Sequence, residues 1–575
     1  MPLDEANMRD PAAAFLDLRP SDAQVEKYYG LGTWRDGTPL DDLRRWREES
    51  PESVAVIAHR ADSGIRRITY REYAEYVERF AGALHELGVR VGDVVAVQLP
   101  NWWQMNALVL ACARIGAVVA PMVMTIRERE LERVLARLRA RVCVTADRWE
   151  GFDHSAALAE LAPRLPELRH RVVLGASVGD DEVDFVRHFQ EAPWEPGRPD
   201  APAEAGPDPD RAFLVLFTSG TSGEPKAALH TLNTLYASSR DFAAVDRVGT
   251  HDRLFTSAAV THYVGIQTCI LIPLLGGAAG VLMDVWEPEA AAALAAEAGV
   301  TYVHAVPLYF GGLLTVVQDQ HRALPALRAA LTGATTIPGD LVALGRSLLD
   351  LPIRAVFGTT EIGLGTMTRP DDPFDRAAHS IGRPFPGTEL DLRADHEITL
   401  EQPARLFVRG GAVCLATLGR DSGALIVTGE HDDGWYDTGD LAVPEEDGGV
   451  RLAGRAGDRI GGVLMIPVSD VESALRTHPA VDDVALVGYP DDTGSERACA
   501  VVVADPASAP PTLADLRHHL DALKMTEWYQ PSRLELVRQL PRNSIGKVQK
   551  ELLRRWVRGE GDLPEERKVD QDRGR

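Results

Sequence analysis

The stretch that decides the fold is AFLVLFTSGTSGEPK, residues 212–226. It opens with an apolar run short enough to be a buried strand. Gly220 and Gly223, with the bend before Pro225, let backbone N–H groups converge on one point, a concave loop that suits a pyrophosphate group. No GxxxxGK[ST] string occurs in the chain, so this is not a Walker A loop. A flexible linker is the alternative, but linkers rarely follow a core strand and end in Pro-Lys. Hydroxyl groups and a positive charge come from Thr218, Ser219, Thr221, Ser222 and Lys226.

A second segment, VFGTTEIG at 356–363, reads as a strand that ends at a glycine and exposes hydroxyl groups and one carboxylate. Such side chains meet in the crevice at the carboxyl ends of strands. Glu361 can hold Mg²⁺ through its oxygen atoms, Thr360 can donate to a phosphate, and Phe357 can stack on a purine. A plain helix N-terminus capped by a threonine is an equally good interpretation of this segment alone.

Two further segments carry polar side chains that indicate a binding site only when they are taken together with the first two segments. In GWYDTGDL, residues 434–441, Asp440 can accept hydrogen bonds from ribose hydroxyls, and Arg455 can return to the same sugar or to a phosphate. In PRNSIGKVQK, residues 541–550, Lys547 follows a turn near the C-terminus. An Asp-Gly turn, a surface arginine and a solvated lysine are the alternatives.

Strands and helices alternate around these segments, which predicts a parallel sheet. Residues 67–98 read strand, helix, Gly-bounded turn, strand, and residues 196–210 form a Pro-rich loop. From about 380 to 453 short strands with Gly turns predict an antiparallel or barrel-like region. We place a domain boundary there, with residues 1–453 forming the N-terminal domain and 454–575 a small mixed domain.

Composition restricts the class of protein. The 575 residues exceed one hydrophobic core. The net charge of −24 excludes a wide nucleic-acid surface. The five cysteines are far apart, which argues against a disulfide framework and suits a cytoplasmic protein. The acidic N-terminus shows no signal peptide, and the most apolar stretch, 106–124, contains Arg114 and reads as a buried helix running into a strand, so we expect no membrane span.

In this order, the four segments resemble the adenylate-forming superfamily of acyl-CoA synthetases, luciferases and peptide-synthetase adenylation domains. VAVQLPNW at 95–102, RERELERVL at 127–135 and RWEGFDH at 148–154 look like medium-chain and alicyclic (cyclohexanecarboxylate-type) CoA ligases. The resemblance implies an α/β fold with a large N-terminal domain of two βα sheets plus a small β-barrel, and a mobile α+β C-terminal domain. ATP or AMP, Mg²⁺ and coenzyme A are the implied cofactors, and a homodimer is compatible with it.

The resemblance also assigns roles by position. Thr218 to Lys226 is the phosphate loop, Glu361 holds magnesium, and Lys547 bridges the carboxylate and ribose-phosphate oxygens during adenylation. His262, in VTHYVG, matches a position that lines the acyl pocket. We expect Lys547, Glu361, Thr218 and His262 to be catalytic. The nucleotide-binding set adds Ser219, Gly220, Thr221, Ser222, Gly223, Lys226, Phe357, Gly358, Thr359, Thr360, Asp440 and Arg455.

Several positions depart from the family pattern. Gly457 stands at the hinge, where Asp or Lys is usual, and the segment after Asp458 is one residue short. Ala227 replaces a glycine after Pro-Lys, and Ile545 replaces a Ser or Thr before Gly-Lys. The first two changes concern the thioester-forming pose and the last two the adenylation pose. We therefore hypothesise that one half-reaction is weak.

The residues around His262 bear on the substrate. Relatives that activate amino acids carry an Asp in this region, whereas residues 260–264 hold no acid. This favours a carboxylate without an amine and an apolar acyl group, such as a medium chain, an alicycle or a terpenoid acid. The alternative is that Tyr263 and Val264 simply pack in the core. Two other functions remain open: loading of a carrier protein's phosphopantetheine, and a silent nucleotide-binding homologue.

Overall fold

The computed structural model describes residues 11–193, 208–218, 226–419, 422–456, 460, 466, 468–491, 496–523, 525, 529–543 and 546–561. Its first large sheet, here called sheet A, has nine strands. The six strands from β16 to β1 in the order below pair in parallel. At the two ends of the sheet, β17, β18 and β2 pair antiparallel with their neighbours. The order is β18 (Arg383–Pro384), β17 (Gly363–Met367), β16 (Ile353–Thr359), β15 (Ala329–Gly333), β14 (Tyr302–His304), β12 (Arg253–Thr256), β13 (Ala279–Met283), β1 (Val54–Arg60) and β2 (Gly64–Thr69).

A second nine-stranded sheet, here called sheet B, has the same plan. Its strands from β10 to β9 pair in parallel, and β11, β21 and β22 extend it with antiparallel pairs. The order is β22 (Leu425–Val427), β21 (Ala416–Gly419), β11 (Lys226–Thr231), β10 (Ala212–Thr218), β4 (Val118–Pro121), β3 (Val94–Gln98), β5 (Val142–Ala146), β8 (His170–Leu174) and β9 (Val183–Asp184). The prediction of two βα sheets is confirmed.

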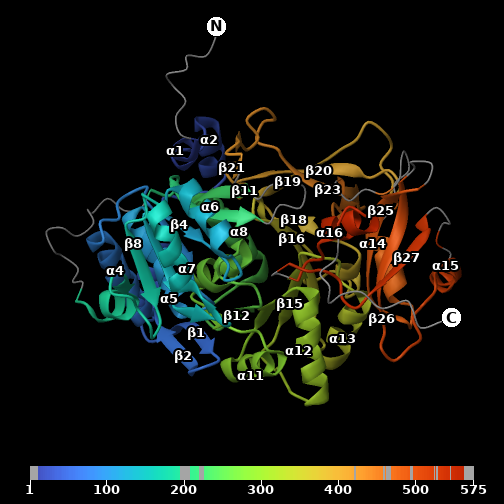
Figure 1. Ribbon diagram of the computed structural model, residues 1–575, viewed down its shortest axis with the longest axis horizontal. Coiled ribbons are helices and arrows are strands. Elements are labelled where there is room, and N and C mark those ends of the chain that lie inside the picture. Colours follow the sequence, from blue (N-terminus) through green and yellow to red (C-terminus); the bar gives the residue numbers. More distant parts are fainter. Residues whose placement is uncertain are drawn as a thin grey trace, which may run out of the picture.

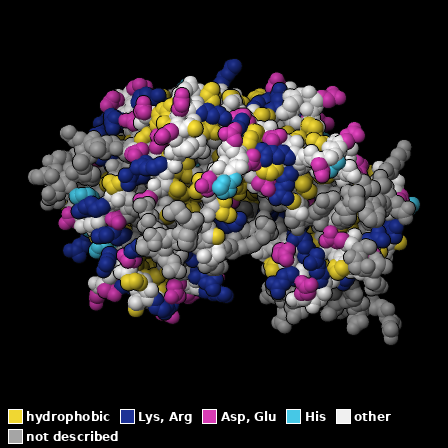
Figure 2. Space-filling model, turned by 90° about the horizontal axis from the view of Figure 1, so that it is seen from above, with side chains coloured by type: hydrophobic (Ala, Val, Ile, Leu, Met, Phe, Trp, Pro, Cys, Tyr) yellow, Lys and Arg dark blue, Asp and Glu magenta, His cyan; other side chains and the backbone are white. Residues whose placement is uncertain are grey.

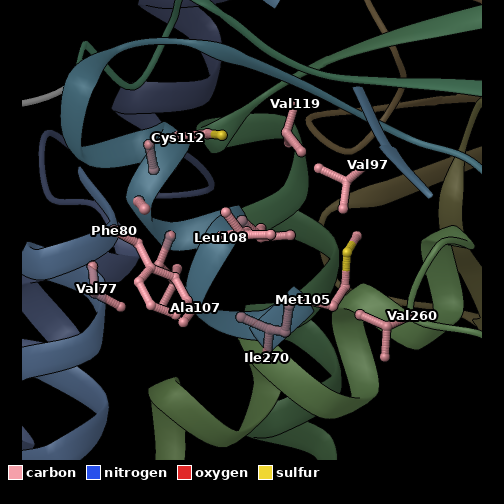
Figure 3. Close-up of a cluster of buried hydrophobic side chains, with 14 of the residues drawn as sticks. Val77, Phe80, Val97, Met105, Ala107, Leu108, Cys112, Val119, Val260 and Ile270 are labelled. Atoms are coloured by element: carbon pink, nitrogen blue, oxygen red, sulfur yellow. The ribbon is translucent and has the colours of Figure 1, made fainter. Parts of the chain in front are cut away.

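Helices fill the space between the sheets and cover both outer faces. Helices α4 (Tyr70–Glu86) and α5 (Trp103–Ile115) bury their apolar side chains against β1 of sheet A and β3 of sheet B (Figure 3). Helices α6 (Glu128–Leu138) and α7 (His154–Leu161) cover the other face of sheet B. Helices α11 (Pro288–Ala298), α12 (Pro307–Asp319) and α13 (Gly339–Leu349) cover the other face of sheet A (Figure 1). The result is five layers, helix–sheet–helix–sheet–helix.

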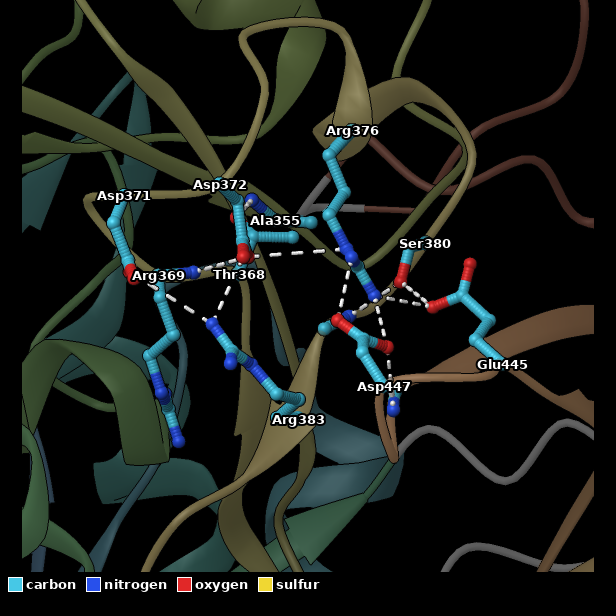
Figure 4. A network of polar contacts seen from close by, with 12 residues as sticks. Ala355, Thr368, Arg369, Asp371, Asp372, Arg376, Ser380, Arg383, Glu445 and Asp447 are labelled. Atoms are coloured by element: carbon cyan, nitrogen blue, oxygen red, sulfur yellow. Dashed lines mark hydrogen bonds and ion pairs between the residues drawn. The ribbon is translucent and has the colours of Figure 1, made fainter.

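The expected antiparallel region is a sheet of four strands. They are β19 (Thr388–Arg393), β20 (Ala404–Gly410), β23 (Tyr436–Pro444) and β24 (Val450–Arg455). A polar network fastens its β23–β24 turn to the segment that follows β17 (Figure 4). Arg376 there bonds Glu445 at 2.8 Å and Asp447 at 2.7 Å, and its guanidinium lowers the pKa of Asp447 to about 2. This fixes the four-stranded sheet beside the β16–β17 end of sheet A.

The C-terminal domain has a three-stranded sheet of β25 (Val481–Pro490), β26 (Glu496–Ala504) and β27 (Arg533–Val537). Helices α14 (Val468–Arg476), α15 (Leu513–Ala522) and α16 (Lys550–Val557) accompany it. The domain thus combines helices and strands, as its description as a small mixed domain predicts. Figure 2 shows Lys and Arg side chains interspersed with Asp and Glu over the visible face of the molecule. Strand β24 runs to Arg455, two residues beyond the predicted domain boundary at 453. The position of this boundary stays a prediction.

Three helices at the N-terminus were not predicted from the sequence. They are α1 (Pro11–Leu16), α2 (Asp22–Gly30) and α3 (Pro39–Glu49). All five cysteines are free, in agreement with the argument from their spacing against a disulfide framework. All five are also buried, and burial raises the pKa of each thiol. Within the described residues no helix is both long and apolar enough to cross a membrane, and α5 and β4 confirm the predicted buried helix and strand at 106–124.

Candidate active site

The predicted phosphate loop joins two antiparallel strands of sheet B. Thr218 ends β10 and is the Cα partner of Lys226, which begins β11 and is exposed. The buried strand expected before the loop is therefore confirmed. Ser219, Gly220, Thr221, Ser222 and Gly223 lie outside the described residues, and their phosphate-binding role stays a prediction.

The segment around Glu361 is the turn of a second hairpin, between β16 and β17 of sheet A. Residues 360–362 form the turn, so the alternative of a helix N-terminus is wrong. The Glu361 N–H donates to Thr359 Oγ1 at 3.2 Å. Gly358 allows the close approach of the two strands, since an added Cβ would lie 2.2 Å from the carbonyl oxygen of Gly363.

Two hydrogen bonds, from His230 and from Cys414, hold the backbone of this turn. Nε2 of His230, on β11, lies 2.6 Å from the carbonyl oxygen of Thr360, and the N–H of Cys414 donates to the carbonyl oxygen of Glu361 at 2.7 Å. Burial lowers the pKa of His230 to about 4, so its ring is neutral at pH 7. Since a carbonyl only accepts, Nε2 carries the proton, and Nδ1 faces Thr234 Oγ1 at 3.0 Å.

Two buried side chains approach the same turn from the other side. Ser238, on α8 (Leu232–Asp246), accepts the N–H of Leu364 at 2.8 Å. A Cβ added at Gly363, where φ is +66°, would lie 2.6 Å from the hydroxyl oxygen of Tyr263. His230, Ser238 and Tyr263 thus form a supporting shell that sequence reasoning did not identify. A histidine that follows the apolar run AAL in the strand KAALHT was the available signal for His230.

Phe357 is 8% exposed and packs in an apolar cluster with Ile362 and Leu406, between sheet A and the four-stranded sheet. Its predicted contact with a purine stays a prediction. Asp440 is 3% exposed on β23 and is the Cα partner of Arg455 on β24. The expected proximity of these two residues is thus present in the backbone.

Lys547 lies in a closed turn of the C-terminal domain that rests on the N-terminal domain. Its N–H donates to Asn543 Oδ1 at 2.9 Å, and its carbonyl accepts the Asn543 N–H at 2.9 Å. At the adjacent Gly546, an added Cβ would lie 3.8 Å from both Leu308 Cδ2 and Val306 Cγ2, at the start of α12. The Lys547 turn is therefore placed at the carboxyl edge of sheet A, where Thr360 and Glu361 also lie.

His262 lies at the same edge, six residues after the end of β12. It immediately precedes α9 (Tyr263–Ile266), and desolvation lowers its pKa to about 4, although the side chain is only half-buried. Neighbouring Tyr263 is buried in the core, so the packing alternative holds for its side chain, while Val264 is half-buried. No acidic residue occurs in 256–268 or 304–308.

The profile of the "AMP-binding enzyme" family matches residues 43–416, and that of the "AMP-binding enzyme C-terminal domain" matches 470–547.

The chain belongs to the AMP-binding enzyme family.

Relatives of this AMP-binding enzyme match it over almost their full length. A salicylyl-CoA synthase / salicylate adenylyltransferase from a Streptomyces species is 31% identical, over 94% of this chain and 97% of the relative. A medium-chain fatty-acid–CoA ligase from Escherichia coli (strain K12) is 29% identical, over 92% of each. The resemblance drawn from the motifs, including its medium-chain type, is confirmed, and the chain is an acid–thiol ligase of the adenylate-forming superfamily.

The fold agrees with solved structures of this superfamily. The anthranilate CoA ligase AuaEII, solved in complex with anthranoyl-AMP, superposes with a TM-score of 0.78 at 22% identity, over 91% of this chain and 97% of that one. This confirms the fold class predicted for the AMP-binding enzyme.

The residues present fit a magnesium ion bound mainly through its nucleotide. Among the described residues, no three His, Cys, Asp or Glu side chains are grouped to hold a metal. Mg²⁺ commonly takes one or two carboxylates and completes its shell with phosphate oxygens and water. The half-buried carboxylate of Glu361, next to two threonines, suits that kind of site.

Proposed function

We propose that this AMP-binding enzyme activates a carboxylic acid that lacks an amine as its acyl-adenylate, and then forms the coenzyme A thioester. The observation that carries the proposal is the position of the Lys547 turn, which rests on Val306 and Leu308 at the edge of sheet A that also holds Glu361. A cation and a carboxylate brought to one edge by separate domains suit the attack of a carboxylate on a phosphate.

In the first half-reaction the substrate carboxylate attacks the α-phosphorus of ATP and pyrophosphate leaves. Lys547 and the donors of the 218–226 loop offset the negative charge that develops on the phosphate oxygens. Mg²⁺ bound at Glu361 would neutralise further charge there. No covalent intermediate with the enzyme is needed, so positioning and electrostatics account for the catalysis.

In the second half-reaction the thiol attacks the mixed anhydride and AMP leaves. For this step we propose that the C-terminal domain rotates away from Val306, since the Lys547 turn otherwise covers that edge of the site. Residues 256–268 and 304–308, the stretches at this edge that include His262 and His304, hold no carboxylate to pair with an ammonium group. This supports an acid with a largely apolar body, such as a medium chain, an alicycle or a terpenoid acid.

ATP–pyrophosphate exchange against a panel of acids tests the first half, and thioester formation with CoA or a carrier protein tests the second. Lys547→Ala is expected to lower exchange at least 100-fold. The matched control is Lys27→Ala, on the exposed surface far from this edge, which should leave exchange unchanged. Intact exchange in Lys547→Ala would refute the role of this lysine, and transfer to a carrier protein in preference to CoA would refute the proposed thiol.

A further inference from the structure

A polar wall lies at the carboxyl edge of sheet A beside His262. His304 ends β14 and is the Cα partner of Thr256, the last residue of β12. Its Nδ1 lies 3.3 Å from Thr268 Oγ1. Thr268 belongs to η4 (Gln267–Leu271), a π-helical turn that continues directly from α9. Irregular turns of this kind occur often at functional sites.

Contacts on both sides place this wall inside the proposed active site. Towards the nucleotide end, Tyr263 reaches the turn that holds Glu361 through Gly363. Towards the C-terminal domain, Val306 follows His304 by two residues and supports the Lys547 turn. A carboxylate held between Glu361 and Lys547 would therefore direct the rest of its acid towards His262, Thr268 and His304.

The two histidines are partly accessible and neutral. Both are half-buried, so neither is fully covered by protein. Desolvation lowers the pKa of each to about 4, so both rings are uncharged at pH 7. Among the described residues, no hydrogen bond reaches the ring of His262, and Thr268 alone bonds that of His304. A neutral imidazole presents one donor and one acceptor, so this wall can bond an uncharged polar group.

We propose that His304 and Thr268 determine specificity by hydrogen bonding a hydroxyl or carbonyl oxygen on the body of the acid, so that the substrate is an oxygenated aryl or alicyclic acid. This rests on the proposed adenylation at the same site. An acid without the oxygen would offer no partner to the His304 ring nitrogen that Thr268 does not bond, and no second partner to the Thr268 hydroxyl, which penalises its binding.

The test compares matched acids in ATP–pyrophosphate exchange with the full chain. Benzoate is paired with the 2-, 3- and 4-hydroxybenzoates, and cyclohexanecarboxylate with its hydroxy and oxo derivatives. We expect at least one oxygenated acid to exceed its parent in kcat/KM by about 10-fold or more. His304→Phe and Thr268→Val, which keep shape but remove hydrogen bonding, should each reduce that ratio about 10-fold, and His304→Asn should restore part of it.

His396→Phe, at an exposed histidine of the four-stranded region, is the control and should leave the ratio unchanged. Parents that react as well as every oxygenated acid, or a ratio that neither His304→Phe nor Thr268→Val alters, would overturn the inference. Because Thr268→Val is nearly isosteric, it remains informative if His304→Phe fails to fold. Absence of exchange with every acid would instead refute the proposed function.

Discussion

The two hairpins that carry the site occupy equivalent places in the two large sheets and are held in different ways. The β10–β11 hairpin in sheet B and the β16–β17 hairpin in sheet A both stand where a run of parallel strands gives way to antiparallel ones. The first is joined by a seven-residue loop with a distinctive Gly/Ser/Thr composition. The second has a three-residue turn whose backbone is fixed by His230, Cys414 and Ser238. Local composition thus specifies one hairpin, and tertiary contacts specify the other.

We expect the largest effect from a change that removes the charge of Glu361 in the β16–β17 hairpin and leaves the hydrogen bonds that hold its turn intact. Glu361→Gln removes the negative charge but keeps the backbone carbonyl that accepts from Cys414. Exchange is expected to fall roughly 10²- to 10³-fold, the usual size for loss of a preorganised electrostatic group. Glu397→Gln, at an exposed glutamate, is the control. A loss of less than about 3-fold would remove Glu361 from the mechanism.

Acid should weaken the link between the hairpins. The pKa of His230 is about 4 in the folded chain, lowered by burial, against 6.5 for an unperturbed histidine. The contribution of the neutral His230 ring to the free energy of unfolding is therefore fully present above pH 6.5. It is lost as the pH falls towards 4, because only the unfolded chain takes up the proton in that window. The loss attributable to this ring is on the order of 3 kcal/mol.

Urea unfolding at pH 7.5, 6.5, 5.5 and 4.5 measures the effect. His154, His262 and His304 have similarly lowered pKa values, so the relevant quantity is the difference between the wild type and His230→Leu. Equal slopes of stability against pH in the two proteins would show that His230 is not buried as a neutral ring.

At pH 7.5 the same His230→Leu change tests the positioning of the turn directly. The Thr360 carbonyl oxygen loses its donor, at a cost of about 1–3 kcal/mol in unfolding free energy. We expect KM for Mg-ATP to rise about 10-fold, with a smaller change in KM for the acid. His230→Gln, which keeps an amide donor, should recover part of this loss. Equal effects on both KM values would indicate a general structural role.

The smallest effect concerns the loop hairpin. Ala227 is fully buried on β11, where the family usually has glycine, and it packs in the core of sheet B. Ala227→Gly should cost about 1 kcal/mol of stability, because glycine loses more freedom in a strand. Exchange should change by less than about 3-fold. A larger gain in exchange would mean that Ala227 limits adenylation, as the hypothesis of a weak half-reaction requires.

Elements specified by their own local sequence could be predicted, whereas those that depend on tertiary contacts could not. Periodicity and short apolar runs located α4 and β3 within residues 67–98, and β10 at the start of residues 212–226, because each is specified by its own pattern. The Thr360–Glu361 turn was left open between a helix start and a loop, because its conformation depends on His230, 130 residues away in the chain. His304 and Thr268 were missed for the same reason, since neither has a motif and only the pairing of β12 with β14 brings them to the edge.

The five buried thiols make the chain a convenient background for site-directed labelling. Cys112, Cys143 and Cys499 are fully covered, and Cys269 and Cys414 are only 2% exposed. With thiol pKa values raised by burial, thiolate is scarce at neutral pH and maleimide dyes should leave the native protein unmodified. A cysteine introduced at exposed Leu31 in the N-terminal domain and another at exposed Leu523 on the C-terminal domain would thus carry a dye pair without prior removal of native cysteines. Energy transfer between the dyes would then report, molecule by molecule, how often the small domain leaves the mouth of the site.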